Sequence, residues 1–215
     1  MGGSWAVRSF SNNFEPELDP GPADTNLIRE LNLPVINLAR FKLSNLQCLD
    51  IVKDYKNCHG IVWIYSDPMK DVDDLQTFIM SNNFWQIRES VNQQILSDMD
   101  NFNIPIALIG GPSDVNNCDY KNISVIHPSW QKFLANLINI EFNQGWDAPY
   151  IHYKMLTYKN IQPSKQIVDA LSENFENFKQ LEHAGLIKGV HPTRLANELF
   201  AKEIKNSIAK WFDNL

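Results

Sequence analysis

Gly60-Ile61-Val62-Trp63-Ile64-Tyr65 is the clearest strand signal in the sequence. Its uninterrupted apolar character is typical of a strand that is covered on both faces. A second run of this kind extends from Ile104 to Ile109 and ends sharply at Gly110-Gly111-Pro112. Both runs therefore predict strands in the interior of the fold.

Weaker strand signals lie at Leu33–Leu38 and at Ile123–Ile126. Helical patterns separate the strands. In chain order they run from Asp24 or Thr25 to Leu31, from Ser44 to about Val52, over 71–100 with a break near 81–83, and over about 129–141, 164–183 and 194–213. The segment 143–163 is rich in aromatic residues, and we predict that it has no regular secondary structure. Strands that alternate with helices predict an α/β fold, here a three-layer α/β/α sandwich with a mostly parallel central sheet.

The length and composition fit one domain over residues 1–215. A net charge of −6 argues against non-specific binding to nucleic acid or to anionic membranes. Met1 to Asn13 lacks the apolar segment of a secretory signal, and no run approaches the ~18 apolar residues that span a bilayer. We therefore expect a soluble protein, cytoplasmic or virion-associated; self-association or assembly into a larger particle stays open.

Cysteine spacing gives no sign of a metal site. Cys48, Cys58 and Cys118 are an odd set without CxxC spacing, which is typical of reduced thiols. The pair Cys58-His59 could begin a metal site, but no second pair follows at ligand spacing. We expect neither a metal nor an organic cofactor.

Two short motifs at opposite ends of the chain carry candidate chemistry. Ser4 stands in Gly2-Gly3-Ser4-Trp5-Ala6, and His191 stands in Gly189-Val190-His191-Pro192-Thr193. A serine hydroxyl becomes a useful nucleophile when a base takes its proton, and imidazole suits that role near neutral pH. The alternative is that Gly-Gly-Ser belongs to a leader and that His-Pro is an ordinary turn before a helix.

The order of these motifs resembles the SGNH (GDSL-like) serine hydrolase family, including SGNH-like proteins of phages. The resembling blocks, in chain order, are Gly2–Ala6, Gly21-Pro22, Val35–Ala39 with Ser44-Asn45, Val62–Pro68 and Gly189–Thr193. The resemblance implies a flavodoxin-like strand order. It also implies that Ser4 is the nucleophile and His191 the general base.

Three positions depart from the family pattern. Lys188 stands where the family has an aspartate, three residues before the catalytic histidine. Lys42 takes the place of the glycine whose amide serves the oxyanion hole, and Asp67 that of an asparagine donor. By resemblance the oxyanion set would be Ser4, Lys42 and Asp67. An aspartate can donate to an oxyanion only when it is protonated.

Other candidates lie where the predicted strands end, because ligands of open α/β sheets bind at the carboxyl ends of the strands. Asp114 follows the predicted strand at 104–109 and could bind substrate, although a loop carboxylate is commonly a turn former. His127 and Trp130 could line a pocket, and core packing is the alternative. The aromatic side chains of 143–163 could stack on a sugar or pack in a lid.

Two functions of different classes remain open. One is a serine esterase that removes acyl groups from a carbohydrate or a small ester and needs no cofactor. The other is a structural or binding protein of the same fold, derived from such an enzyme, whose catalytic residues have decayed. Intact Ser4 and His191 favour the enzyme, and the three substituted positions favour the binding protein.

Overall fold

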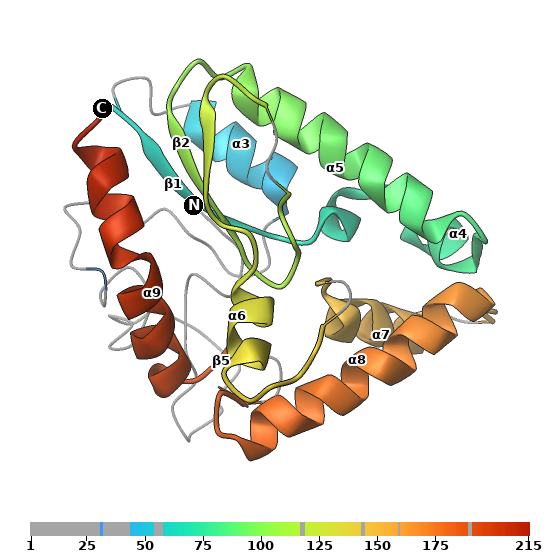
Figure 1. The fold of residues 1–215 in the computed structure, drawn as a ribbon. Coiled ribbons are helices and arrows are strands. Elements are labelled where there is room, and N and C mark those ends of the chain that lie inside the picture. Colours follow the sequence, from blue (N-terminus) through green and yellow to red (C-terminus); the bar gives the residue numbers. More distant parts are fainter. Residues whose placement is uncertain are drawn as a thin grey trace.

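The structure is a computed structural model that describes residues 31, 44–53, 58–116, 119–142, 145–158, 160–188 and 191–215. The chain folds into a mixed α/β structure (Figure 1). Its elements, in chain order, are α3 Asn45–Lys53, β1 Ile61–Tyr65, the 3-10 helix η1 Pro68–Asp71, α4 Leu75–Met80, α5 Phe84–Asp100, β2 Ile106–Gly110, β3 Ile123–His127, α6 Trp130–Asn136, α7 Ala148–Thr157, α8 Lys165–His183, β4 Ile187–Lys188, β5 His191–Pro192 and α9 Arg194–Phe212.

A parallel sheet of three strands forms the centre of the described fold. Its order is β1-β2-β3, with Ile61 opposite Ile106 and Ile106 opposite Ile123. The predicted parallel sheet is thus confirmed for these strands. A register shift between Leu108 and Ile109 loosens the regular pairing of β2 with β3. The predicted strand at 33–38 lies outside the described residues.

Alternate side chains of β1 and β2 enter two different hydrophobic clusters. Val62 and Ile64 pack with helices α6 and α9, whereas Trp63 packs with α3 and α5. In Figure 1 the strands lie between α9 on one side and α3 and α5 on the other. This period of two explains why β1 is apolar throughout: each face of the sheet has its own core.

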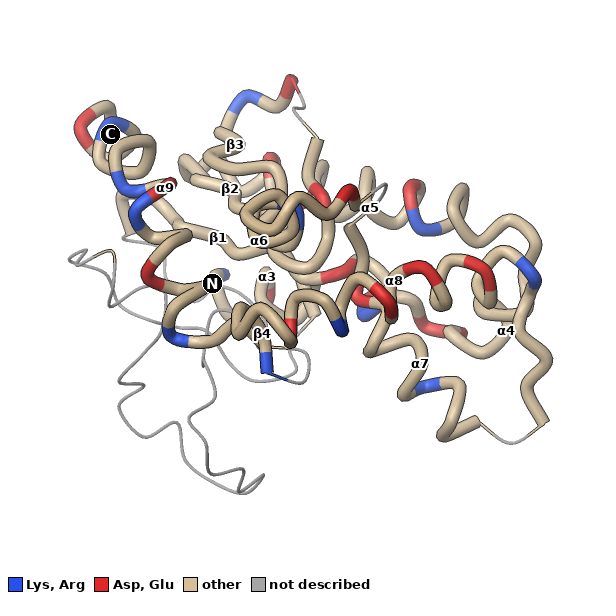
Figure 2. Tube along the Cα trace, turned by 60° about the horizontal axis from the view of Figure 1, so that its bottom comes forward, with Lys and Arg blue, Asp and Glu red and all other residues tan. Residues whose placement is uncertain are grey.

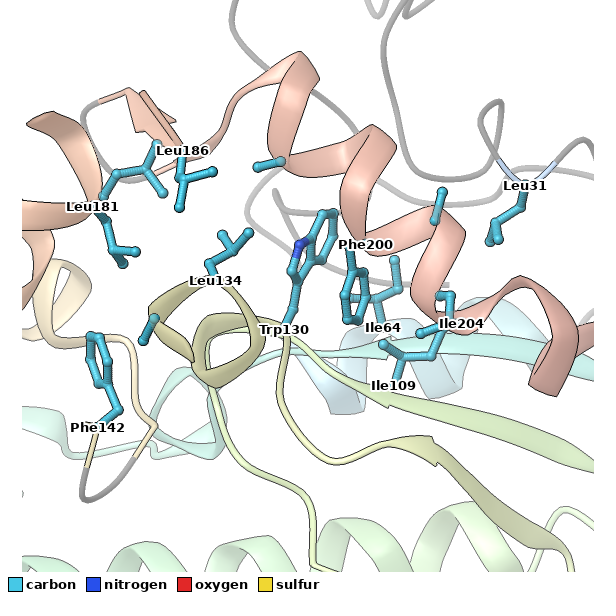
Figure 3. Packing of buried hydrophobic residues seen from close by; sticks show 14 of the residues in the cluster. Leu31, Ile64, Ile109, Trp130, Leu134, Phe142, Leu181, Leu186, Phe200 and Ile204 are labelled. Carbon is cyan, nitrogen blue, oxygen red and sulfur yellow. The ribbon is translucent and has the colours of Figure 1, made fainter. Parts of the chain in front are cut away.

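The α6–α9 side is built around stacked aromatic rings. Trp130 of α6 lies almost parallel to Phe200 of α9, with ring centroids 4.7 Å apart. Figure 3 shows both rings standing above Ile64 and Ile109 of the sheet. Both rings are fully buried, so the pair anchors the C-terminal helix to the sheet.

A third cluster joins α4, α7, α8 and the first turn of α5; together we call α4, α7 and α8 the helical lobe. Its buried side chains are Met69, Leu75, Phe78, Ile79, Phe84, Trp146, Ala148, Ile151, Ile167 and Leu171. Phe84 packs against Phe78 and Trp146, with ring centroids at 4.6 and 5.7 Å. The lobe therefore adjoins the rest of the fold through α5 and the segment before α7, and the C-terminal half of α8 joins the cluster of α6 and α9 through Phe178 and Leu181.

Most predicted helices are present, with one addition. The break predicted near 81–83 separates α4 from α5. The prediction of an irregular 143–163 was wrong over α7, where Asp147 accepts a hydrogen bond from the Tyr150 amide and Pro149 lies in the first turn. Helix α6 ends at Asn136, earlier than predicted. Asn139, three residues later, has a left-handed backbone with a φ of 56°. Within the described ranges, no helix is long and apolar enough to cross a membrane.

Candidate functional site

A buried carboxylate lies just beyond the carboxyl end of β1. Asp67 is fully buried, and it accepts hydrogen bonds from the backbone amides of Met69 at 2.9 Å and Asp147 at 2.7 Å. The hydroxyl of Ser113, from the loop after β2, donates to the same carboxylate. The Arg88 guanidinium lies 3.4 Å from Oδ2. We call these residues the Asp67 cluster.

The cluster keeps Asp67 ionised. Burial by itself would raise the pKa of this carboxyl, but the Arg88 charge and the hydrogen bonds from Ser113, Met69 and Asp147 outweigh burial and hold the pKa below its usual value. An ionised carboxylate only accepts hydrogen bonds. Asp67 therefore has no proton to offer an oxyanion, whereas the asparagine of the family pattern would have an amide donor.

Arg88 of α5 connects the ends of two strands to the segment before α7. Its Nη2 lies 3.0 Å from Ser113 Oγ and 3.2 Å from the Gly145 carbonyl oxygen, in addition to the Asp67 contact. The guanidinium also lies over the Trp85 ring, 6.0 Å from the centroid. Breaking one side of such a buried ion pair is costly because the other charge stays buried.

A second ion pair lies beside the first. Lys70 Nζ is 3.0 Å from Asp147 Oδ2, and their side chains are only 10% and 13% exposed. Burial lowers the pKa of Lys70, but the pairing with Asp147 outweighs burial and the net shift is upward. Asp147 thus connects the two ion pairs. Its backbone amide donates a hydrogen bond to Asp67, and its carboxylate pairs with Lys70.

His191 lies near the second pair. It belongs to the two-stranded hairpin β4–β5, opposite Lys188. Burial lowers the pKa of His191 to about 4, with Asp147 acting upward and Lys70 downward. The charges of Asp147 and of Lys70, in η1 after β1, thus act on the imidazole, which is neutral at pH 7. The Lys188 side chain is exposed.

The remaining predicted site residues fall in three places. Ser4 and Lys42 lie outside the described residues. Asp114 pairs with Lys132 at 2.6 Å and accepts from the Gly145 amide at 3.0 Å, so it anchors the segment before α7. Trp130 packs in the core against Phe200, and the partly buried His127 contacts the same ring.

His127 is partly buried at the end of β3. Its Nδ1 accepts a hydrogen bond from the Ser129 amide at 3.2 Å. Burial lowers its pKa, although Glu203 and the Ser129 bond act upward. Neither His127 nor Trp130 is among the described residues that line a pocket between α5 and α8.

The sequence reasoning missed Lys70, Arg88, Ser113 and Asp147. For Arg88 a signal existed, because Phe84, Arg88 and Asn92 follow one another at helical spacing on the buried face of α5. An arginine in line with core residues indicates a buried anionic partner. Asp147 gave no such signal, since its partner Asp67 is 80 positions away.

A pocket of about 260 Å³ lies between α5, α8 and the segment before α7. Its lining residues are Trp85, Phe142, Trp146, Asp169, Ala170, Glu173 and Asn174. Trp146 stands between Gly145 and Asp147, whose backbone atoms both belong to the hydrogen bonds around Asp67 and Arg88. The Asp67 cluster therefore fixes one wall of this pocket.

The part of the chain that the structure describes has no group of three or more His, Cys, Asp or Glu side chains that could hold a metal ion. No protein-family model matches the chain, and no curated protein or solved structure matches it.

Proposed function

We propose that the chain is a slow serine esterase of the SGNH type that acts on a carbohydrate ester or another small ester. In this mechanism the Ser4 hydroxyl attacks the acyl carbonyl while His191 accepts its proton. The alcohol leaves with that proton, and water then hydrolyses the acyl-serine. Ser4 enters from the sequence motif alone.

The observation that carries the proposal is the placement of His191. A general base must be neutral before the reaction, and burial keeps this imidazole neutral at pH 7. The charges of Asp147 and Lys70 act on it, and Lys70 stands in η1 after β1; ligands of α/β proteins bind where parallel strands end. The Asp147 carboxylate acts on it in the direction that stabilises an imidazolium.

The same geometry explains why we expect slow turnover. A histidine with a pKa of about 4 is a weak base, and the nearby Lys70 cation disfavours its protonated form. Asp67 is ionised, so the site lacks the side-chain donor that the resemblance implies at this position.

The occupied Asp67 favours a second candidate, a binding protein of this fold without turnover. Among the described residues, Met69, Ser113, Asp147 and Arg88 bind this carboxylate, which gives it a structural role. Such a protein would keep the neutral His191 but hydrolyse no ester.

Two assays on one set of variants separate the candidates. The esterase should hydrolyse p-nitrophenyl acetate and be labelled at Ser4 by a fluorophosphonate, and Ser4→Ala should abolish both signals. His191→Gln should reduce kcat at least about tenfold. Ser172→Ala, an exposed serine of α8, is the matched control and should leave both signals unchanged.

The pH profile gives an independent readout. If His191 is the base, kcat/KM should fall as the pH is lowered, because the imidazole becomes protonated. The apparent pKa of this fall should be near 4, well below the usual histidine range. Absence of labelling in folded protein, or labelling that survives Ser4→Ala, contradicts the esterase and supports the binding protein.

A further inference from the structure

The pocket at α8 has aromatic walls. Trp85 and Trp146 meet edge to face with ring centroids 5.4 Å apart, and Phe142 lies on the same lining. Trp146 is fully buried, and Trp85 is partly exposed. Indole faces attract cations through the negative potential of the ring. The pocket therefore has walls suited to a positively charged group.

Two side chains of the lining are acidic. Asp169 and Glu173 stand one helical turn apart on α8 and contribute two carboxylates. No lysine or arginine is among the described residues that line the pocket. Figure 2 shows that acidic positions recur along α8. The charge of the lining matches a cation.

Asn174 adds a buried acceptor. The residue is 6% exposed, and its Nδ2 donates to the Ala170 carbonyl at 3.1 Å. Its Oδ1 is buried, and among the described residues it has no hydrogen-bond partner. A buried acceptor without a donor is costly, so a ligand that brings an N–H group would remove that cost.

We propose that this pocket binds a small organic cation with at least one ammonium N–H, such as a primary alkylamine. The ammonium group donates to Asn174 Oδ1 and faces the carboxylates of Asp169 and Glu173. Its alkyl part lies against Trp85 and Trp146. A volume of about 260 Å³ admits a chain of a few carbons and no large ligand.

This site goes beyond the esterase proposal and does not depend on it. His191 is not among the described lining residues, and the test measures binding instead of hydrolysis. Failure of one proposal leaves the other untouched.

The experiment is a calorimetric titration of the full chain at pH 7 with n-butylammonium, tetramethylammonium and methyl glucoside as probes. Butylammonium should bind saturably with one site. Tetramethylammonium should bind at least tenfold more weakly, because it has no N–H for Asn174. The glucoside should bind at least tenfold more weakly, because it has no positive charge to face the carboxylates of Asp169 and Glu173.

Variants of α8 assign the binding to this pocket. Asn174→Leu should weaken butylammonium binding at least tenfold, and Glu173→Gln should weaken it several-fold. Glu176→Gln is the matched control, since it removes the same charge from an exposed position of the same helix outside the lining. Circular dichroism verifies that each variant is folded.

Three results would overturn the assignment. They are absence of saturable butylammonium binding, equal affinity for tetramethylammonium, and equal losses in Glu173→Gln and Glu176→Gln. Saturable binding of the glucoside in place of the amine would instead identify a sugar site.

Discussion

The carboxylate of Asp67 accepts hydrogen bonds from three separate parts of the chain. The amide of Met69 is local, but Ser113 is 46 positions away and Asp147 is 80 positions away. Arg88 supplies the balancing charge from α5. A single residue therefore holds the ends of β1 and β2 to the start of α7.

Asp67→Asn tests this role. The substitution keeps the shape of the side chain but leaves Arg88 buried without a counter-charge. The new amide NH₂ would also face the N–H and O–H groups that donate to Asp67. We expect the free energy of unfolding in urea to fall by about 3–5 kcal/mol. Asp50→Asn, which breaks an exposed pair with Lys53, should change it little. Equal effects of the two variants would contradict a structural role for the buried pair.

His191 should make stability depend on pH. Its folded pKa of about 4 is below the unfolded value of about 6.5, so on acidification the unfolded chain takes up a proton first. Stability therefore falls as the pH drops below about 6.5, by up to about 2 kcal/mol at pH 5.

The measurement is the free energy of unfolding at pH 7 and pH 5 for wild type and His191→Gln. His127 also has a lowered pKa, but it contributes to both proteins and cancels in the comparison. The variant should lose less stability than the wild type between the two values. Equal losses would mean that His191 is not buried in its neutral form.

At the scale of elements, the exit of β2 is closely packed. A Cβ added at Gly110 would collide with the backbone carbonyl of Pro128, and one added at Gly111 would lie 2.6 Å from the Tyr65 carbonyl oxygen. Both obstacles are backbone atoms of neighbouring strand ends and cannot rotate away. The two glycines therefore allow β2 to turn into the loop that carries Ser113.

Gly110→Ala should be strongly destabilising, by at least about 3 kcal/mol, because neighbouring backbone must move. Gly185→Ala is the matched control. Gly185 follows α8 with a φ of 69° and would have no atom within 4 Å of its new Cβ. It should cost only about 1 kcal/mol, from the left-handed backbone alone. Thermal unfolding of both variants would contradict this account if the two midpoints were equally lowered.

At the scale of the whole molecule, the sheet was predictable and the helical lobe less so. Apolar runs predicted β1 and β2, which are buried throughout, and a shorter run predicted β3, which is only partly buried. The helix α7 was missed, since its start depends on Asp147 and Pro149 in a segment rich in aromatic side chains. A flavodoxin-like strand order stays a prediction, as the strand expected at 33–38 lies outside the described residues.

The candidate site was predictable only in part. The carboxyl edge of the sheet followed from the fold class, and Asp67 and His191 were named from their motifs. Their neighbours could not be, because Arg88 meets Gly145 at a separation of 57 positions and Asp147 meets Asp67 at 80. Periodicity describes one element at a time, whereas these contacts arise from packing between elements.

The same separations have a kinetic consequence. Closing a long loop costs more chain entropy than closing a short one, and folds rich in distant contacts form slowly. The contacts between Asp67 and Asp147 close one of the long loops of the described structure. We therefore expect the sheet with α3 and α5 to assemble early in folding, and the helical lobe to dock onto it late.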